Sequence, residues 1–312
     1  MASENQSVVT EFVFQGLSSQ PGTQTVLFIV FLVSYLFTMV GNVLVITVIR
    51  ADCRLHSPMY LFLANLSFLD ICYISSYIPQ MLVNLLTKKK TISFSGCAAQ
   101  LYFSLAFGMT ECVLLGVMAY DRYMAICHPL RYTIVMNRKV CIHMVVASWT
   151  SGLLSSMVIT SVTVWLPFCR SDILNHYYCE VQAVLALTCA HTALMELVIF
   201  IFSILILFIP FLLIIISYAH ILSVILKIRS AHVQYKTFST CGSHLMVVTI
   251  FYGTGICIYM TPTSRPPQDR DKVVALFYTI VAPMLNPIIY SLRNKDMKRA
   301  LSTAMNRPKS LF

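Results

Sequence analysis

The sequence predicts an all-α membrane protein, a bundle of seven transmembrane helices with a short amphipathic helix at its C-terminal end. Composition is the first reason, because 58% of the 312 residues are apolar and only 11% are charged, whereas about a quarter of a soluble domain is charged. Segmentation is the second reason, since seven apolar stretches each exceed the roughly 20 residues that span a bilayer as a helix. Their approximate ranges are 24–50, 58–84, 97–127, 140–165, 193–227, 237–261 and 272–291.

These spans divide the chain into an N-terminal tail over residues 1–23, the helical bundle over 24–291 and a short C-terminal tail over 292–312. No segment outside the spans has the length of a soluble domain. The N-terminal tail lacks a charged region followed by a separate apolar core. We therefore expect no cleavable signal peptide, so that the first helix directs its own insertion.

The distribution of basic residues predicts the orientation. Seven of the 22 Lys and Arg residues fall in segments on the side of the N-terminus, and the remaining 15 fall on the opposite side. Basic residues gather on the cytoplasmic side of membrane proteins, so we expect the N-terminus outside and the C-terminus inside. The same distribution explains the net charge of +10 without a nucleic-acid partner. The seven are Lys88, Lys89, Lys90, Arg170, Arg265, Arg270 and Lys272.

Two kinds of residue agree with this orientation. Asn5-Gln6-Ser7 is an acceptor triplet for N-glycosylation in the tail expected outside. Four of the 11 cysteines also lie in segments expected outside, an oxidising environment, where they allow three disulfide pairings. The His and Cys spacing over 169–191 matches no zinc pattern, so we expect no metal site. The four are Cys97, Cys169, Cys179 and Cys189.

The most informative stretch is residues 118–132, which read M-A-Y-D-R-Y-M-A-I-C-H-P-L-R-Y. It places an Asp121–Arg122 pair at the end of an apolar segment, where charges are expensive and normally functional. The run resembles the end of helix 3 in rhodopsin-like G-protein-coupled receptors, and its extended form resembles the odorant (olfactory) receptors. Similar motifs occur along nearly the whole chain, at Gly41-Asn42, Pro58–Asp70, Ser217-Tyr218, Lys236–His244 and Pro283–Asn294.

The resemblance implies a function. It suggests a multi-pass receptor of the plasma membrane, not an enzyme, that binds a small volatile odorant and activates a heterotrimeric G protein of the stimulatory, olfactory type, raising cyclic AMP. The lipid bilayer and receptor-trafficking chaperones are the other partners that it implies. It also suggests the disulfides Cys97–Cys179 and Cys169–Cys189.

Asp70 and Glu111 are predicted to form a polar cluster near the middle of the membrane. At about 1.5 Å of rise per residue, both lie near the midplane when counted from the ends of their helices. Two neighbouring carboxyl groups cannot both ionise cheaply, so we expect them to share a proton or to bind a cation such as sodium, with Asn286 nearby. The alternative is a protonated, hydrogen-bonded cluster without an ion. No other cofactor is expected.

A second cluster is predicted at the cytoplasmic end. We expect Asp121 and Arg122 to pair in the resting state, and the resemblance implies that Arg122 is released on activation to meet the G protein. The alternative is an ion pair that only sets the depth of the helix. Residues 227–245 contain no Asp or Glu, so Tyr218 and His244 are the available polar partners. By resemblance, Tyr123, Asn286, Pro287 and Tyr290 complete this switch.

The sixth span departs from the general receptor pattern, because no proline lies between Thr237 and Thr261. We therefore expect no proline kink there, although Gly253 and Gly255 allow bending.

The resemblance places a ligand pocket in the outer half of the bundle, under the second extracellular loop. The alternative for each residue is ordinary packing between helices. Ser104 stands where amine receptors carry an Asp, and the set contains no Lys or Arg, so a small, mostly apolar, neutral ligand is expected; Glu180 and Arg265 are charged loop residues nearby. The set is Ser104, Leu105, Gly108, Met109, Cys112, Phe202, Ser203, Ile206, Tyr252, Gly255, Ile256 and Tyr259.

Two other functions compete with this interpretation. A transporter or channel would favour internal repeats and helices broken at the midplane, and the sequence shows no repeat. An intramembrane enzyme would use Asp70 and Glu111 as a catalytic pair with His244 as a base, but His244 is predicted half a membrane away from them.

Overall fold

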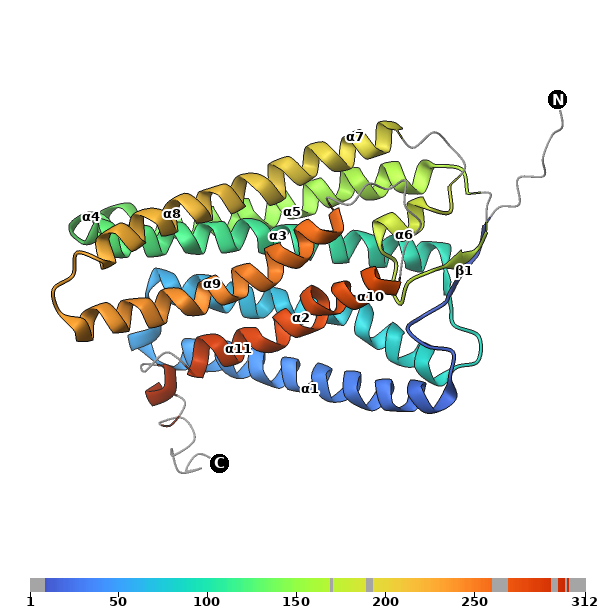
Figure 1. The fold of residues 1–312 in the computed structure, drawn as a ribbon, viewed down its shortest axis with the longest axis horizontal. Coiled ribbons are helices and arrows are strands. Elements are labelled where there is room, and N and C mark those ends of the chain that lie inside the picture. Colours follow the sequence, from blue (N-terminus) through green and yellow to red (C-terminus); the bar gives the residue numbers. More distant parts are fainter. Residues whose placement is uncertain are drawn as a thin grey trace.

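The computed structural model is an elongated bundle of long helices (Figure 1). It describes residues 9–168, 171–188, 193–259, 269–292, 297–300 and 302. Seven helices within these ranges are long and apolar enough to cross a membrane. The predicted fold class is therefore confirmed.

The first four spanning helices begin at residues that suit a helix N-terminus. Proline occupies the first turn of the first two, where its missing N–H costs nothing. Ser93 and Asn137 cap the third and fourth by accepting the N–H groups of Gly96 and Val140, each at 3.1 Å. The helices are α1 (Pro21–Ala51), α2 (Pro58–Leu86), α3 (Phe94–Cys127) and α5 (Arg138–Trp165), and the connections carry η1 (Cys53–Leu55) and α4 (Pro129–Val135).

The last three spanning helices are less regular. Each of the fifth and seventh contains one π-helical segment, a rare geometry that is often found at functional sites. The sixth begins at residue 231, earlier than the predicted 237. The fifth consists of α7 (Ala193–Phe202), η2 (Ser203–Phe208) and α8 (Ile209–Ile225); the sixth is α9 (Ala231–Tyr259); the seventh consists of α10 (Asp269–Leu276), η3 (Phe277–Val281) and α11 (Ala282–Leu292).

A small sheet closes one end of the bundle, which the sequence did not predict. Strand β1 (Glu11–Phe14) lies in the N-terminal tail, antiparallel to β2 (Thr91–Ser93) and parallel to β3 (Ile173–Leu174). Its register pairs Phe12 with Ile92. Figure 1 shows β1 and α6 (Val181–Leu185) at the end of the bundle opposite α4. The sheet therefore joins the N-terminal tail to the loop between α5 and α7, called loop 2 below.

Helix α3 lies at the centre of the packing, and glycines allow its neighbours to approach closely. A Cβ atom on Gly152 of α5 would lie 2.1 Å from Thr110 Oγ1 of α3, and one on Gly116 would lie 3.2 Å from Pro210. Small residues are common where membrane helices meet, because dispersion contacts replace the hydrophobic effect there. These contacts fix α5 and α8 against α3.

The C-terminal segment is described in part. Residues 297–300 are helical, with Met297 and Ala300 buried and Lys298 and Arg299 exposed. This alternation agrees with the predicted amphipathic helix.

Candidate functional site

A cavity of about 90 Å³ lies between α3, the fifth helix, α9 and the seventh helix, beneath loop 2. Its wall is mostly aliphatic and aromatic, as in ligand sites formed between helices. A cavity of about 150 Å³ is enough for benzene, so a larger ligand requires movement of side chains. The lining residues are Tyr73, Leu101, Ser104, Leu105, Gly108, Met109, Cys112, Ile159, Tyr178, Glu180, Val181, Ile199, Phe202, Ser203, Ile206, Leu207, Phe251, Gly255 and Tyr278.

Most of the residues predicted for the pocket lie on this wall. All those predicted on α3 and on the fifth helix line it, and so does Gly255. A Cβ atom on Gly108 would meet nothing within 4 Å, so this glycine leaves open space rather than admitting a neighbouring helix. Ligand contact by these residues stays a prediction.

Two predicted residues, Tyr252 and Ile256, are not among those that line the cavity. The Tyr252 side chain is fully buried, donates a hydrogen bond to the Cys112 carbonyl at 2.7 Å and stacks on Phe211. Successive residues on a helix point about 100° apart, so Phe251 faces the cavity instead. The error came from the rotation of α9, which a short motif does not determine.

The residues that sequence reasoning missed come mainly from loop 2 and the neighbouring helices. Tyr178 and Val181 belong to loop 2, Ile159 to α5 and Tyr278 to η3. Glu180, expected only as a charged loop residue near the pocket, lines the cavity as well. The expected Cys97–Cys179 disulfide could have predicted the residues from loop 2, since a bond at Cys179 brings its sequence neighbours over the top of α3.

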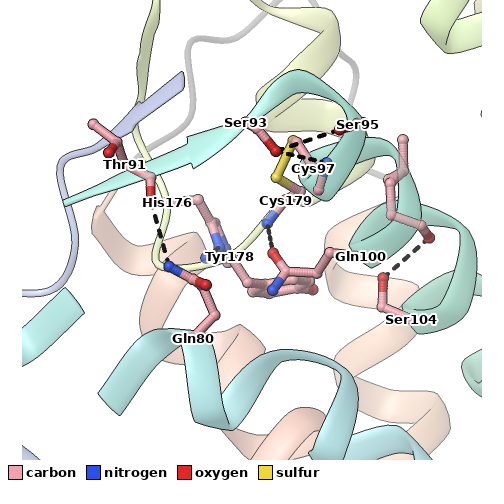
Figure 2. The surroundings of a disulfide bond; sticks show 12 residues. Gln80, Thr91, Ser93, Ser95, Cys97, Gln100, Ser104, His176, Tyr178 and Cys179 are labelled. Carbon is pink, nitrogen blue, oxygen red and sulfur yellow. Dashed lines mark hydrogen bonds between the residues drawn. A yellow bond between two sulfur atoms is a disulfide. The ribbon is translucent and has the colours of Figure 1, made fainter. Parts of the chain in front are cut away.

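The Cys97–Cys179 disulfide that the resemblance implied is present in the structure. Figure 2 shows Gln100, one turn further along α3, whose Oε1 accepts the Cys179 N–H at 2.8 Å. The Gln100 amide also donates to the Ser76 carbonyl of α2 at 3.3 Å. Loop 2 is thus attached to α3 by one covalent bond and one hydrogen bond at the same place.

Loop 2 also contacts the seventh helix through two buried tyrosines. The Tyr178 and Tyr278 hydroxyls lie 2.7 Å apart, and the Tyr177 hydroxyl lies 3.0 Å from Thr279 Oγ1. Thr279 also accepts a hydrogen bond from Tyr77 through its carbonyl oxygen. These contacts fall on the π-helical segment η3, so loop 2 meets the seventh helix where its geometry is irregular.

Charged groups above the cavity are held in particular states by their surroundings. Burial, together with the charge of Lys272, lowers the pKa of His176 to about 3, so this imidazole is neutral and its Nδ1 accepts the Tyr178 N–H at 3.4 Å. Burial raises the pKa of Glu180 to about 7. The Lys272 ammonium donates to the Gly16 carbonyl at 3.1 Å, which connects the seventh helix to the N-terminal tail.

Asp70, Glu111 and Asn286 form the polar cluster predicted near the midplane, and all three are buried. The Asn286 amide donates to both carboxylate oxygens of Asp70, at 3.0 and 3.2 Å. Among the described residues, neither oxygen of Glu111 nor the Asn286 Oδ1 has a well-formed hydrogen bond, although the Asn286 amide also acts on the Glu111 carboxyl. Gly41 lies against Pro287, the residue after Asn286, where an added Cβ would come within 3.0 Å of the proline ring.

The predicted ion pair at the cytoplasmic end of α3 is wrong for this structure. The Asp121 carboxylate accepts the Tyr132 hydroxyl of α4 at 2.8 Å, and no ion pair joins it to Arg122 within the described ranges. Adjacent residues on a helix do not face each other, so Arg122 lies on another face. There it is within electrostatic reach of Tyr218 and Tyr290.

Tyr218 and His244 were predicted as polar partners of Arg122, and the structure pairs them with each other. The Tyr218 hydroxyl lies 2.9 Å from His244 Nδ1, and the two rings stack with centroids 5.7 Å apart. Tyr123 instead lies 3.0 Å from His128 through its hydroxyl. The contact between Tyr218 and His244 connects α8 to α9 beside Arg122.

Comparison with known proteins gives the family. A sequence model described as olfactory receptor matches residues 31–307. The chain belongs to the olfactory receptor family. Olfactory receptor 2K2 of Homo sapiens is 51% identical over 307 residues, which cover 98% of this chain and 97% of that protein. Olfactory receptor 5AR1 of Mus musculus is 50% identical over 307 residues, covering 98% and 99%, and Olfactory receptor 2D2 of Homo sapiens is 50% identical over 303 residues, covering 97% and 98%.

This olfactory receptor is therefore a class A G-protein-coupled receptor that spans the membrane several times. The family assignment removes the transporter and the intramembrane enzyme as leading interpretations. Several predicted features of the receptor fall outside what the structure describes: Asn5, Cys169, Cys189 and the side chain of Tyr259.

Proposed function

We propose that this olfactory receptor binds small, neutral volatile molecules in the cavity and responds by activating a heterotrimeric G protein of the stimulatory, olfactory type, which raises cyclic AMP. One observation carries the proposal: a mostly apolar cavity lies between the helices, with Arg122 toward the opposite end of the same helix α3 that forms its wall.

The wall of the cavity favours neutral ligands. Ser104 faces the cavity where a counter-ion for an amine would stand, and no Lys or Arg lines it among the described residues. Glu180 is the one acid on the described wall, and it is already engaged as the cap of α6. Burying a charged ligand without a partner costs far more than burying a neutral one. Alcohols, aldehydes, ketones and esters are therefore the proposed agonist classes.

A physical route connects the cavity to the cytoplasmic end. Cys112 lines the cavity, and its carbonyl oxygen accepts the hydrogen bond from Tyr252 of α9. The same helix carries His244, which is bonded to Tyr218 beside Arg122. We propose that a ligand shifts α9 relative to α3, which separates Tyr218 from His244 and frees Arg122 to meet the G protein.

The proposed location is the plasma membrane, with the N-terminus outside and the C-terminus in the cytoplasm. The distribution of basic residues supports this orientation. The cavity then lies in the extracellular half of the bundle, and Arg122 lies at the cytoplasmic side.

The midplane cluster is the proposed site of a sodium ion. The unpartnered oxygens of Glu111 and Asn286, together with the carboxylate of Asp70, supply the oxygen ligands that hard cations prefer. The cluster contains only two acids, and no group of three or more metal-binding side chains occurs in the described chain. Two neighbouring carboxyl groups cannot both ionise cheaply, so the pair carries one negative charge, which a monovalent ion balances.

A cyclic-AMP assay with a panel of volatile ligands tests the proposal. Cells expressing the receptor with the stimulatory, olfactory-type G protein should respond to at least one neutral volatile. Arg122→Ala should abolish that response while the amount of receptor at the cell surface stays close to wild type. An unchanged response from Arg122→Ala would contradict the proposed coupling, and a response confined to amines or carboxylates would contradict the ligand class.

A further inference from the structure

Glu180 is a buried acid at the roof of the cavity. It follows Cys179 directly, so the disulfide and the Gln100 hydrogen bond hold its backbone over α3. Its side chain is only 6% exposed and lines the cavity. One carboxylate oxygen, Oε2, accepts the Ala183 N–H at 3.0 Å and caps α6. The other, Oε1, has no well-formed hydrogen bond within the described part of the chain, but it exposes less than 1 Å², and the Val181 and Gln182 N–H groups also act on the carboxyl.

Several other polar groups at the cavity are already engaged. The Ser104 hydroxyl donates to the Leu101 carbonyl at 3.1 Å. The Tyr178 and Tyr278 hydroxyls bond each other. Buried polar atoms normally have a partner, so a rotation of the Glu180 side chain that brings this oxygen to the cavity would leave it to be paired by a ligand group.

We propose that Glu180 sets the specificity of this receptor by accepting a hydrogen bond from the ligand, so that the preferred agonists carry a hydroxyl group. This inference rests on the proposed function and narrows it from neutral volatiles in general to hydrogen-bond donors. An ether or ketone of the same skeleton leaves Oε1 unpaired and places its own acceptor against a carboxylate. A site with a buried polar group rejects ligands that cannot pair with it.

Substitution by glutamine makes a directional prediction. An amide nitrogen cannot accept the Ala183 N–H, so the amide oxygen of the variant must take over the position of Oε2. Its NH₂ group then takes the place of Oε1 and offers a donor to the ligand when the side chain turns toward the cavity. Glu180→Gln should therefore change the preference of the receptor from hydroxyl ligands to ketones, rather than simply weaken all responses.

The experiment measures cyclic-AMP potency for straight-chain primary alcohols from butanol to octanol, together with the methyl ether and the methyl ketone of each chain. For the wild type we expect the alcohol to be preferred over its ether by about tenfold or more, the value of one hydrogen bond to a charged group. Glu180→Gln should lower this ratio and raise the ketone-to-alcohol ratio, and Glu180→Ala should remove both preferences. Ratios within one variant do not depend on its surface expression.

Asp172→Asn is the matched control, because Asp172 is an exposed acid of the same loop and should leave the ratios at their wild-type values. Equal potency of alcohols and ethers at the wild type, or unchanged ratios in Glu180→Gln, would overturn the role of Glu180 while leaving the receptor function intact. A wider panel in which no volatile activates the wild type would instead overturn the proposed function itself.

Discussion

At the scale of single residues, the unpaired atoms of buried polar groups are the most informative. Neither carboxylate oxygen of Glu111 has a well-formed hydrogen bond among the described residues, whereas Asn286 donates to both oxygens of Asp70. An unpaired buried polar group costs about 1–3 kcal/mol, so such an arrangement is expected to serve a ligand, an ion or a change of state.

The first prediction concerns these two acids. Asp70→Asn and Glu111→Gln should each change basal signalling and remove its dependence on sodium, because each replaces a charged oxygen ligand by a neutral amide. The measurement is basal cyclic AMP at a series of sodium concentrations with ionic strength held constant. A wild-type receptor that is insensitive to sodium would leave the protonated cluster as the explanation.

The second prediction uses the acidity of Glu180. Its pKa is raised to about 7 by burial, and Asp271 is the other charged group that acts on it in the described chain. The carboxyl is ionised above that pH and protonated below it, and an ionised oxygen is the stronger acceptor. Responses of the wild type to alcohols should therefore strengthen as extracellular pH rises from 6 to 8, whereas the responses of Glu180→Gln should not change with pH over this range. A parallel pH profile in the variant would show that another group titrates.

At the scale of elements, close approach between helices determines the bundle. Gly152 of α5 faces Thr110 and the Ala106 carbonyl of α3, and an added Cβ would lie 2.1 and 2.6 Å from their oxygens. Neither distance is tolerable without separating the two helices.

The third prediction follows from this contact. Gly152→Ala should destabilise the receptor by about 1–3 kcal/mol, the usual cost of overpacking, and should reduce its delivery to the cell surface. Gly22→Ala is the matched control, since a Cβ there meets nothing within 4 Å. Thermal unfolding of the two purified variants checks the difference, and equal melting temperatures would contradict it.

Element positions were predictable from the sequence, but their rotations and irregularities were not. Long apolar segments fix the spans, so most boundaries differ from prediction by a few residues. Tyr252 was misplaced because the rotation of α9 depends on its contact with Cys112. The π-helical segments η2 and η3 and the strand β1 were missed because they depend on contacts between distant parts of the chain. Asp121 accepts a hydrogen bond from Tyr132 of α4, and helix periodicity alone does not predict this partner.

At the scale of the whole molecule, one end of the bundle is closed by loop 2, the N-terminal strand and the disulfide together.

The fourth prediction tests the disulfide that connects loop 2 to α3. Cys97→Ser and Cys179→Ser should each prevent surface delivery, because losing a native disulfide typically costs about 2–5 kcal/mol. The double variant should be no worse than either single one, since both remove the same bond. Surface immunolabelling measures this, and a much more severe double variant would argue against the pairing.

The central claim is that a ligand in the cavity controls nucleotide exchange on a G protein at the other end of the bundle. The most direct measurement uses purified receptor in lipid nanodiscs with a stimulatory heterotrimeric G protein. It measures the rate at which the G protein binds GTP, with and without an alcohol agonist. We predict that the agonist accelerates exchange at the wild type. The agonist should not accelerate exchange in Arg122→Ala, because this variant lacks the coupling residue. It should also not accelerate exchange in Gly108→Leu, because the leucine side chain fills the open space beside position 108. Agonist-stimulated exchange that survives in Gly108→Leu with unchanged potency would contradict the claim, because the ligand would then be acting outside this cavity.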